Sequence, residues 1–177
     1  MTTSPLRKRV SPLLWVAALL TLVLGVAAGL PALSAQAAAA IDSSRTATLV
    51  ITKSEPGDGP GGPATGLATD TGSRNRISGV TFKVTRVPGV DLSTNQGWER
   101  AQRLSLEDAV RNVRGLPATA QGTTGADGVL TLSNLPLGLY VVEETAAPSG
   151  YVLASPFVVA LPMTNPDQPG QWMYTVH

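Results

Sequence analysis

The 177-residue sequence contains no cysteine and a single histidine, His177, which is the last residue. Without cysteine there is neither a disulfide framework nor a thiolate metal site. One terminal histidine excludes a histidine-based metal site or catalytic triad within one chain. The adjacent carboxylates Glu143 and Glu144 point to opposite faces of a strand and cannot act as a pair. We therefore expect no enzyme activity, no metal and no cofactor.

Charged and aromatic residues are also scarce, at 14% and 5% of the chain. Of the 13 Lys and Arg residues, three lie at positions 7–9, which leaves 10 basic residues against all 12 acidic ones after position 40, a net charge of −2. Scattered basic residues with few aromatics exclude a nucleic-acid partner. The 18 glycines and 14 prolines favour a turn-rich, all-β chain.

The N-terminus has the composition of a targeting segment. Basic residues 7–9 precede an apolar run at 13–30, Pro31 breaks that run, and residues 35–37 form an A-x-A cleavage site. We predict a helical signal peptide at 1–37 and an exported domain at 38–177. The alternative is an uncleaved anchor, because the apolar run approaches the ~20 residues of a membrane-spanning helix.

Alternating apolar and polar residues predict the first strands. In residues 47–53, Leu49, Ile51 and Lys53 share one face, so a lysine is placed beside two core residues. The lysine could instead end the strand with its ammonium in water. Residues 77–87 form a second half-buried strand. Between them, the Gly- and Pro-rich residues 54–78 predict a long exposed loop.

Residues 91–113 are the one segment predicted to be helical, and residues 92–98 form a turn-rich approach that ends in Trp98. Ser105 followed by Asp108 fits a helix-start capping pattern, and the apolar residues after it recur at helical spacing. This apolar stripe favours a short helix packed across the sheet over a groove for a partner. Three further strands are predicted at 129–132, at 152–161, where Pro156 interrupts the pattern, and at 171–177.

The most informative stretch is residues 140–151. Tyr140, Val142 and Glu144 alternate on one face of a strand that ends at the turn 148–150. Glu144 faces solvent if it marks the end of the strand. If that face is the core, the carboxylate must pair, hydrogen-bond or be protonated.

These residues resemble the E-box of Gram-positive pilins, YxLxETxAPxGY, which occurs in immunoglobulin-like domains of the CnaB type. Valine replaces leucine at one position, and the other positions match. The matching positions are Tyr140, Val142, Glu144, Thr145, Ala147, Pro148, Gly150 and Tyr151.

The end of the sequence resembles the start of the pilin motif, W-x-x-x-V-x-V-Y-P-K. Trp172 and Val176 match at the right spacing, and the acceptor lysine of the motif is absent from residues 1–177. We therefore expect a domain truncated at the start of that motif. Residues 161–164, Leu-Pro-Met-Thr, are not a sortase signal because Asn165 follows in place of glycine; we expect a loop there.

The resemblance also implies a role for Glu144. In the family this glutamate can promote a Lys–Asn isopeptide bond or help pilus assembly, and Lys53 is the candidate amine on the matching strand. The usual asparagine partner belongs to the final strand. The alternative to the bond is a structural role, in which Glu144 holds a turn or forms an ion pair with Lys53.

The sequence is thus similar to the N-terminal domain of a SpaA-type major (backbone) pilin. This implies an all-β, immunoglobulin-like (CnaB-type) sandwich with one short inserted helix. It also implies a structural subunit of a sortase-assembled fimbria used in adhesion, located at the cell surface or cell wall. Expected partners are other pilin subunits, a class C sortase, and host proteins or glycans. The alternatives are a secreted adhesin and a minor or basal pilin that binds a host ligand without polymerising.

Overall fold

The computed structural model describes residues 40–56, 64–69, 72 and 74–177. The signal-peptide prediction, at 1–37, lies outside these residues and stays a prediction. None of the helices among the described residues is long and apolar enough to span a membrane.

The first sheet is built around β1 (Ala47–Thr52), the strand predicted at 47–53. β1 pairs antiparallel with β4 (Val129–Leu135) and parallel with β9 (Thr175–Val176). The parallel pairing joins Thr48 to Thr175 and Leu49 to Val176, so β9 lies beside only the first half of β1.

The second sheet is antiparallel, in the order β3 (Ala120–Thr123), β2 (Thr81–Arg86), β5 (Gly138–Ala146), β6 (Phe157–Leu161). The sequence pattern missed β3, because its Ala-Gln-Gly-Thr sequence has no apolar alternation. β6 begins at Phe157 and not at 152, because residues 151–156 are irregular up to Pro156.

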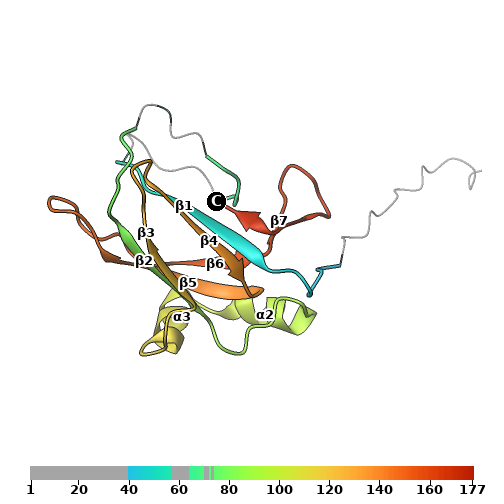
Figure 1. Ribbon diagram of the computed structural model, residues 1–177. Helices are drawn as coiled ribbons and strands as arrows, with labels where there is room; N and C mark the ends of the chain where they lie inside the picture. The colour runs from blue at the N-terminus through green and yellow to red at the C-terminus, as the bar shows by residue number, and fades with distance from the viewer. Residues whose placement is uncertain (1–39, 57–63, 70–71, 73) are drawn as a thin grey trace, which may run out of the picture. The chain divides into compact units, whose positions relative to one another are not determined.

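The two sheets form a β-sandwich, as predicted (Figure 1). Buried side chains of both sheets make one core. We call this cluster the sandwich core. Its buried members are Ala47, Leu49, Ile51, Ile77, Val80, Phe82, Val84, Leu130, Leu132, Leu135, Leu137, Tyr140, Val142, Leu161 and Val176.

Two helices, α2 (Asn95–Arg103) and α3 (Leu106–Val113), cover the other face of the β2–β5 sheet (Figure 1). The prediction of one helix is wrong. Leu104 has an extended backbone that ends α2, and Ser105 caps a new helix by accepting a hydrogen bond from the Asp108 amide. We call the second cluster the helix layer; its buried members are Val87, Val90, Leu92, Ala109, Val113, Leu139 and Val141.

Two other expectations need correction. The predicted loop after Leu161 contains β7 (Met163–Thr164), which pairs with β8 (Trp172–Met173), so the predicted strand 171–177 is two short strands, β8 and β9. The predicted loop 54–78 is not wholly exposed. Gly66 and Ile77 are buried, and Ser54 forms an isolated bridge with Arg76.

Candidate functional site

Lys53 and Glu144 form an ion pair at the margin of the sandwich core. The Lys53 ammonium donates to Glu144 Oε1 at 2.5 Å, and the side chains are 23% and 5% exposed, respectively. The carboxylate is therefore buried and does not face solvent. A buried carboxylate needs a partner of this kind because desolvation penalises its charge.

The local fold explains why the two side chains meet. Lys53 directly follows β1, where its amide donates to the Gly128 carbonyl at 2.8 Å and its carbonyl accepts from the Ile77 amide at 3.0 Å. Glu144 lies opposite Phe82 on the neighbouring strand, on the core face that it shares with Val142. Each of the two residues follows alternating core residues of its strand, on the same face as they do. The pair therefore lies at the end of the core, between the two sheets.

The second oxygen of Glu144 has a partner that the sequence did not reveal. Oε2 accepts from the Ala154 amide at 2.8 Å. This bond ties the irregular segment 151–156 to the end of β5. No local pattern identifies it, because it depends on how the segment folds back after the turn at 148–150.

The other E-box residues have different structural tasks. Tyr140 and Val142 are fully buried in the sandwich core, and the Tyr140 hydroxyl donates to the Pro136 carbonyl. Burial raises the pKa of Tyr140 to about 12, and the positive charge of Arg86 opposes that shift. Thr145 is exposed and donates to the Thr81 carbonyl at 3.3 Å.

The end of the E-box forms a turn. Ala147 and Pro148 are half-buried, and the Tyr151 amide donates to the Pro148 carbonyl at 3.2 Å. Gly150 has φ of +91°, a backbone conformation that favours glycine. The Tyr151 hydroxyl donates to the Glu55 carboxylate at 3.3 Å, so the turn contacts the segment that follows β1.

The pilin-motif residues Trp172 and Val176 lie on β8 and β9. Val176 is 1% exposed and belongs to the sandwich core. Trp172 contacts Trp98 of α2, with ring centroids 5.4 Å apart and planes at 31°. No sequence pattern predicts a contact between these two tryptophans, which are 74 residues apart (172 − 98).

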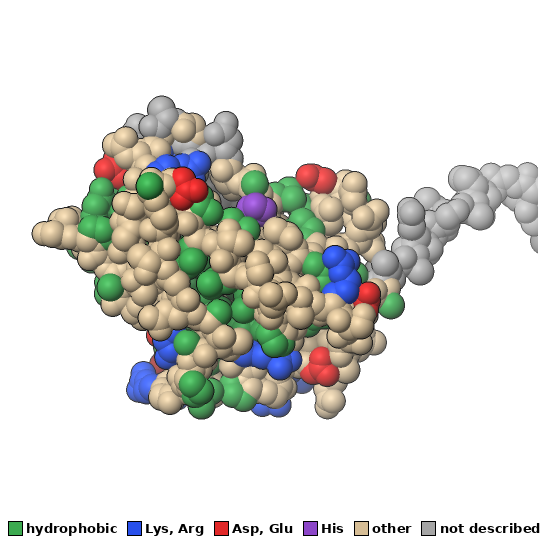
Figure 2. All heavy atoms as spheres, viewed as in Figure 1, with side chains coloured by type: hydrophobic (Ala, Val, Ile, Leu, Met, Phe, Trp, Pro, Cys, Tyr) green, Lys and Arg blue, Asp and Glu red, His purple; other side chains and the backbone are tan. Residues whose placement is uncertain are grey.

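An apolar groove of about 320 Å³ opens between β1 and β6, beside Val176. Here β1 extends past its pairing with β9, and β6 is the edge of its sheet among the described residues. Figure 2 shows hydrophobic side chains gathered near His177 on this face. Phe157 and Val158 are 44% and 41% exposed. The groove lining is Leu49, Val50, Ile51, Thr52, Ala64, Gly66, Phe157, Val158, Val159, Ala160, Met163, Val176 and His177.

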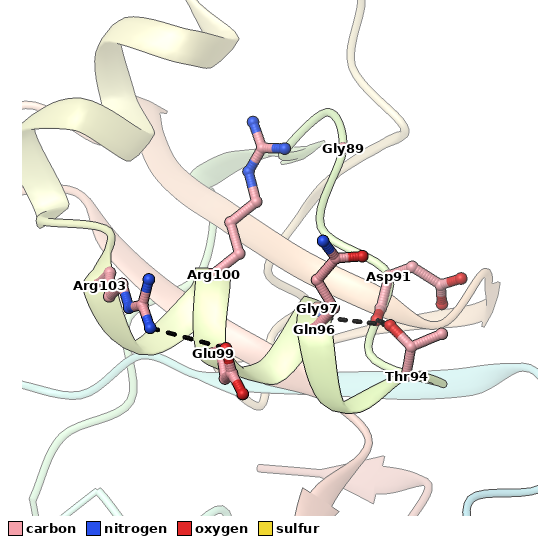
Figure 3. A pocket seen from close by; sticks show the side chains of 8 residues that line it. All are labelled: Gly89, Asp91, Thr94, Gln96, Gly97, Glu99, Arg100 and Arg103. Atoms are coloured by element: carbon pink, nitrogen blue, oxygen red, sulfur yellow. Dashed lines mark hydrogen bonds and ion pairs between the residues drawn. The ribbon is translucent and has the colours of Figure 1, made fainter.

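The described residues contain no group of three or more His, Cys, Asp or Glu side chains that could hold a metal ion. A separate hollow beside α2 is polar and open, between Gly89, Asp91 and the arginines Arg100 and Arg103 (Figure 3). Arg103 is engaged in an ion pair with Glu99, at 3.6 Å. Neither a metal-binding group nor the hollow beside α2 therefore adds a functional group to the Lys53–Glu144 pair among the described residues.

Comparison with known proteins identifies the family. Residues 45–177 match the family model of the Gram-positive pilin subunit D1, N-terminal domain. The type 1 fimbrial subunit of Actinomyces viscosus is 34% identical over 140 residues, which is 77% of this chain and 26% of that protein.

Solved structures support the same family assignment. The full-length major pilin SpaD of Corynebacterium diphtheriae is 34% identical, with a TM-score of 0.62, over 77% of this chain and 31% of that one. The SpaA pilin–signal peptide complex from the same organism gives 30% identity and a TM-score of 0.60, over 75% of this chain and 94% of that one. The chain spans about a quarter to a third of the full-length relatives. It belongs to the Gram-positive pilin family and contains the N-terminal domain of such a pilin.

Proposed function

We propose that this domain is part of a structural subunit of a sortase-assembled, cell-surface pilus that serves adhesion. The observation that carries the proposal is the family match over 45–177, which includes the motif residues Trp172 and Val176. Relatives that are at least 30% identical are fimbrial subunits and major pilins. Other pilin subunits and a class C sortase are the proposed partners, and the domain has a structural, not a catalytic, role.

The apolar groove between β1 and β6 supports a contact with another subunit. Among the described residues, the end of β1 and the outer edge of β6 have no paired strand and lie beside exposed apolar side chains. Such edges favour the addition of an extended peptide. A relative of which this chain covers 94% was solved as a pilin–signal peptide complex. We propose that the groove takes an extended, apolar segment of a neighbouring subunit during assembly.

The test is pilus assembly in a Gram-positive host that expresses the whole gene together with a class C sortase. We expect a ladder of covalent, high-mass species on a denaturing gel. Phe157→Ser in the groove should reduce the ladder several-fold while secretion is unchanged. Leu116→Ser is the matched control, because Leu116 is 37% exposed, similar to Phe157, and does not line the groove.

No ladder with any co-expressed pilin sortase would overturn the proposed function. An equal loss in the Leu116 variant would overturn the role of the groove and leave the pilus function standing. Binding of the secreted chain to collagen, fibrinogen or host cells, without polymerisation, would favour the alternatives, an adhesin or a minor or basal pilin.

For Lys53 and Glu144 we propose a structural ion pair in place of an isopeptide bond. An isopeptide bond would join Lys53 Nζ to an asparagine side-chain carbon and release ammonia. Among the described residues the hydrogen bond of the Lys53 ammonium goes to Glu144. We expect the intact mass of the secreted chain to equal the mass calculated for residues 38–177. A mass lower by one ammonia that is restored in Lys53→Arg would contradict this proposal.

We also propose export through the signal peptide at 1–37. The basic segment, apolar run and A-x-A site support it. N-terminal sequencing of the secreted protein should begin at Ala38. Retention of the protein in the membrane with residues 1–37 attached would instead support the anchor alternative.

A further inference from the structure

The segment from Trp172 to Val176 is held at alternate residues by three different parts of the domain. Trp172 contacts Trp98 in α2. The Tyr174 ring lies under the Arg45 guanidinium, 3.8 Å from its centroid. Val176 is buried in the sandwich core beside β1. The segment therefore runs from the helix layer to the sandwich core.

The strand pairing of this segment is short. β8 meets β7 through two residue pairs, Met163 with Met173 and Thr164 with Trp172. β9 meets β1 through two more pairs. Two-residue strands supply too few hydrogen bonds for order on their own, so side-chain contacts must contribute to the position of the segment.

The local structure of α2 fixes the orientation of the Trp98 ring. Thr94 caps the helix by accepting from the Gly97 amide at 3.0 Å (Figure 3). Gly97 packs so close to Asp91 that an added Cβ would lie 1.6 Å from the Asp91 carbonyl oxygen. The Trp98 ring nitrogen then donates to the Leu92 carbonyl at 2.7 Å.

This arrangement gives a structural role to residues 91–98, Asp-Leu-Ser-Thr-Asn-Gln-Gly-Trp. The close approach at Gly97 brings the start of α2 against the loop at Asp91, and Leu92 is fully buried beneath it. The indole of Trp98 is thus held at its nitrogen and presents its ring to Trp172. A tilted ring pair of this kind contributes beyond its buried area.

We propose that Trp98 is a positioning residue for the pilin-motif segment Trp172–Val176. Through its contact with Trp172 it fixes β8, and thereby the alignment of β9 with β1 and the direction in which the chain leaves the domain. The functional significance of this alignment rests on the proposed pilus function. The contact itself can be tested without any polymerisation.

The test is amide hydrogen exchange, followed by NMR, on the secreted chain. Two reporter amides depend on the segment: Thr48 donates to the Tyr174 carbonyl at 2.7 Å, and His177 donates to the Gly66 carbonyl at 2.9 Å. A reference amide, Lys53, donates to Gly128 on the opposite edge of β1. In Trp98→Ala we expect Thr48 and His177 to exchange roughly tenfold faster relative to Lys53.

Val113→Ala is the matched control. Val113 is a buried member of the helix layer in α3, whereas the ring that contacts Trp172 belongs to Trp98 in α2. Its truncation should leave the exchange of the Thr48 and His177 amides unchanged relative to that of the Lys53 amide. Trp172→Ala should reproduce the selective effect of Trp98→Ala, and the double variant should add little to either single one.

Trp98→Phe should restore most of the protection, because it retains an aromatic ring while losing the bond to Leu92. Equal acceleration of all three amides in Trp98→Ala, or additive effects of Trp98→Ala and Trp172→Ala, would overturn the proposal. These outcomes are independent of pilus assembly. A selective exchange effect in a chain that never forms a ladder would leave the contact standing and reject the pilus function.

Discussion

Strand β5 separates two apolar clusters that are built in different ways. Tyr140 and Val142 enter the sandwich core, whereas Leu139 and Val141 enter the helix layer. The sandwich core is made mainly by alternate residues of paired strands. The helix layer is made by loop and helix residues that pack on the back of the same strand. Both faces of β5 are therefore buried over residues 139–142.

Each cluster ends in a different kind of contact. The Lys53–Glu144 ion pair closes the sandwich core, and the Trp98–Trp172 contact borders the helix layer. The ion pair connects the two sheets, whereas the ring pair connects a helix to the pilin-motif segment. On our proposal, the sandwich core joins the two sheets, whereas the helix layer orients the C-terminal segment through Trp98.

The largest loss of stability should come from truncating a large side chain in the sandwich core. Phe82 is 2% exposed, so Phe82→Ala should lower the free energy of unfolding by about 3–5 kcal/mol. Leu92→Ala in the helix layer should cost about 2–5 kcal/mol by the same reasoning. Urea unfolding followed by circular dichroism gives both values.

Hydrogen exchange then separates the clusters. Phe82→Ala should raise the exchange of strand amides and helix amides together. Leu92→Ala should expose α2 and α3 first while the amides between β2 and β5 stay protected. Equal exposure of all amides in the Leu92 variant would show that the two clusters unfold as one unit. That result would contradict the distinction between the sandwich core and the helix layer.

The ion pair should show an asymmetric cost. Lys53→Met leaves the Glu144 carboxylate, 5% exposed, without its cation, and we expect a loss of about 2–4 kcal/mol in unfolding free energy at neutral pH. Glu144→Gln leaves an ammonium that is 23% exposed and can reach water, and should cost about 1–2 kcal/mol.

The control for that asymmetry is the double variant Lys53→Met/Glu144→Gln. Removing both charges should recover part of the loss seen in Lys53→Met, because no unpaired charge stays buried. Thermal melts of the four proteins provide the measurement. A Glu144→Gln loss larger than that of Lys53→Met would contradict the burial argument.

The sandwich was predictable because its strands alternate. In β1 the residues Leu49 and Ile51 enter the core as the period of two requires, and Lys53 continues on their face. The E-box residue Glu144 follows the same rule on β5. Strand β3 was not predictable, since its pairing with β2 depends on tertiary contact and not on its own residues.

The helix layer and the groove were less accessible from sequence. Leu104 and Leu106 fit one helical stripe, yet the chain is extended at Leu104, and Leu106 is 44% exposed. The capping pattern at Ser105 was a correct signal for a helix start within the single helix predicted at 91–113. The Trp98–Trp172 contact required the position of β8, which short-range patterns do not provide.

A smaller effect concerns pH. Burial raises the pKa of Tyr140 from 10.0 to about 12, so the unfolded chain ionises first as pH rises. The contribution of Tyr140 to the free energy of unfolding is fully present below pH 10 and is lost as pH rises from 10 to about 12. Tyr140→Phe should remove that part of the alkaline decline. Unfolding midpoints that fall identically in both proteins would contradict the assignment to Tyr140.

The smallest expected effect comes from the helix cap. The Ser105 hydroxyl accepts from the Asp108 amide at 3.1 Å, so Ser105→Ala should cost about 1 kcal/mol. Ser105→Thr is the matched control, because it retains the accepting oxygen. Hydrogen exchange of the Ala109 amide, which donates to the Ser105 carbonyl at 2.9 Å, reports α3 directly. If the helix layer opens independently of the sandwich core, the Ala109 amide should exchange faster while the exchange rate of the Lys53 amide is unchanged. A matching rise at Lys53 would instead place α3 in the same cooperative unit as the sandwich.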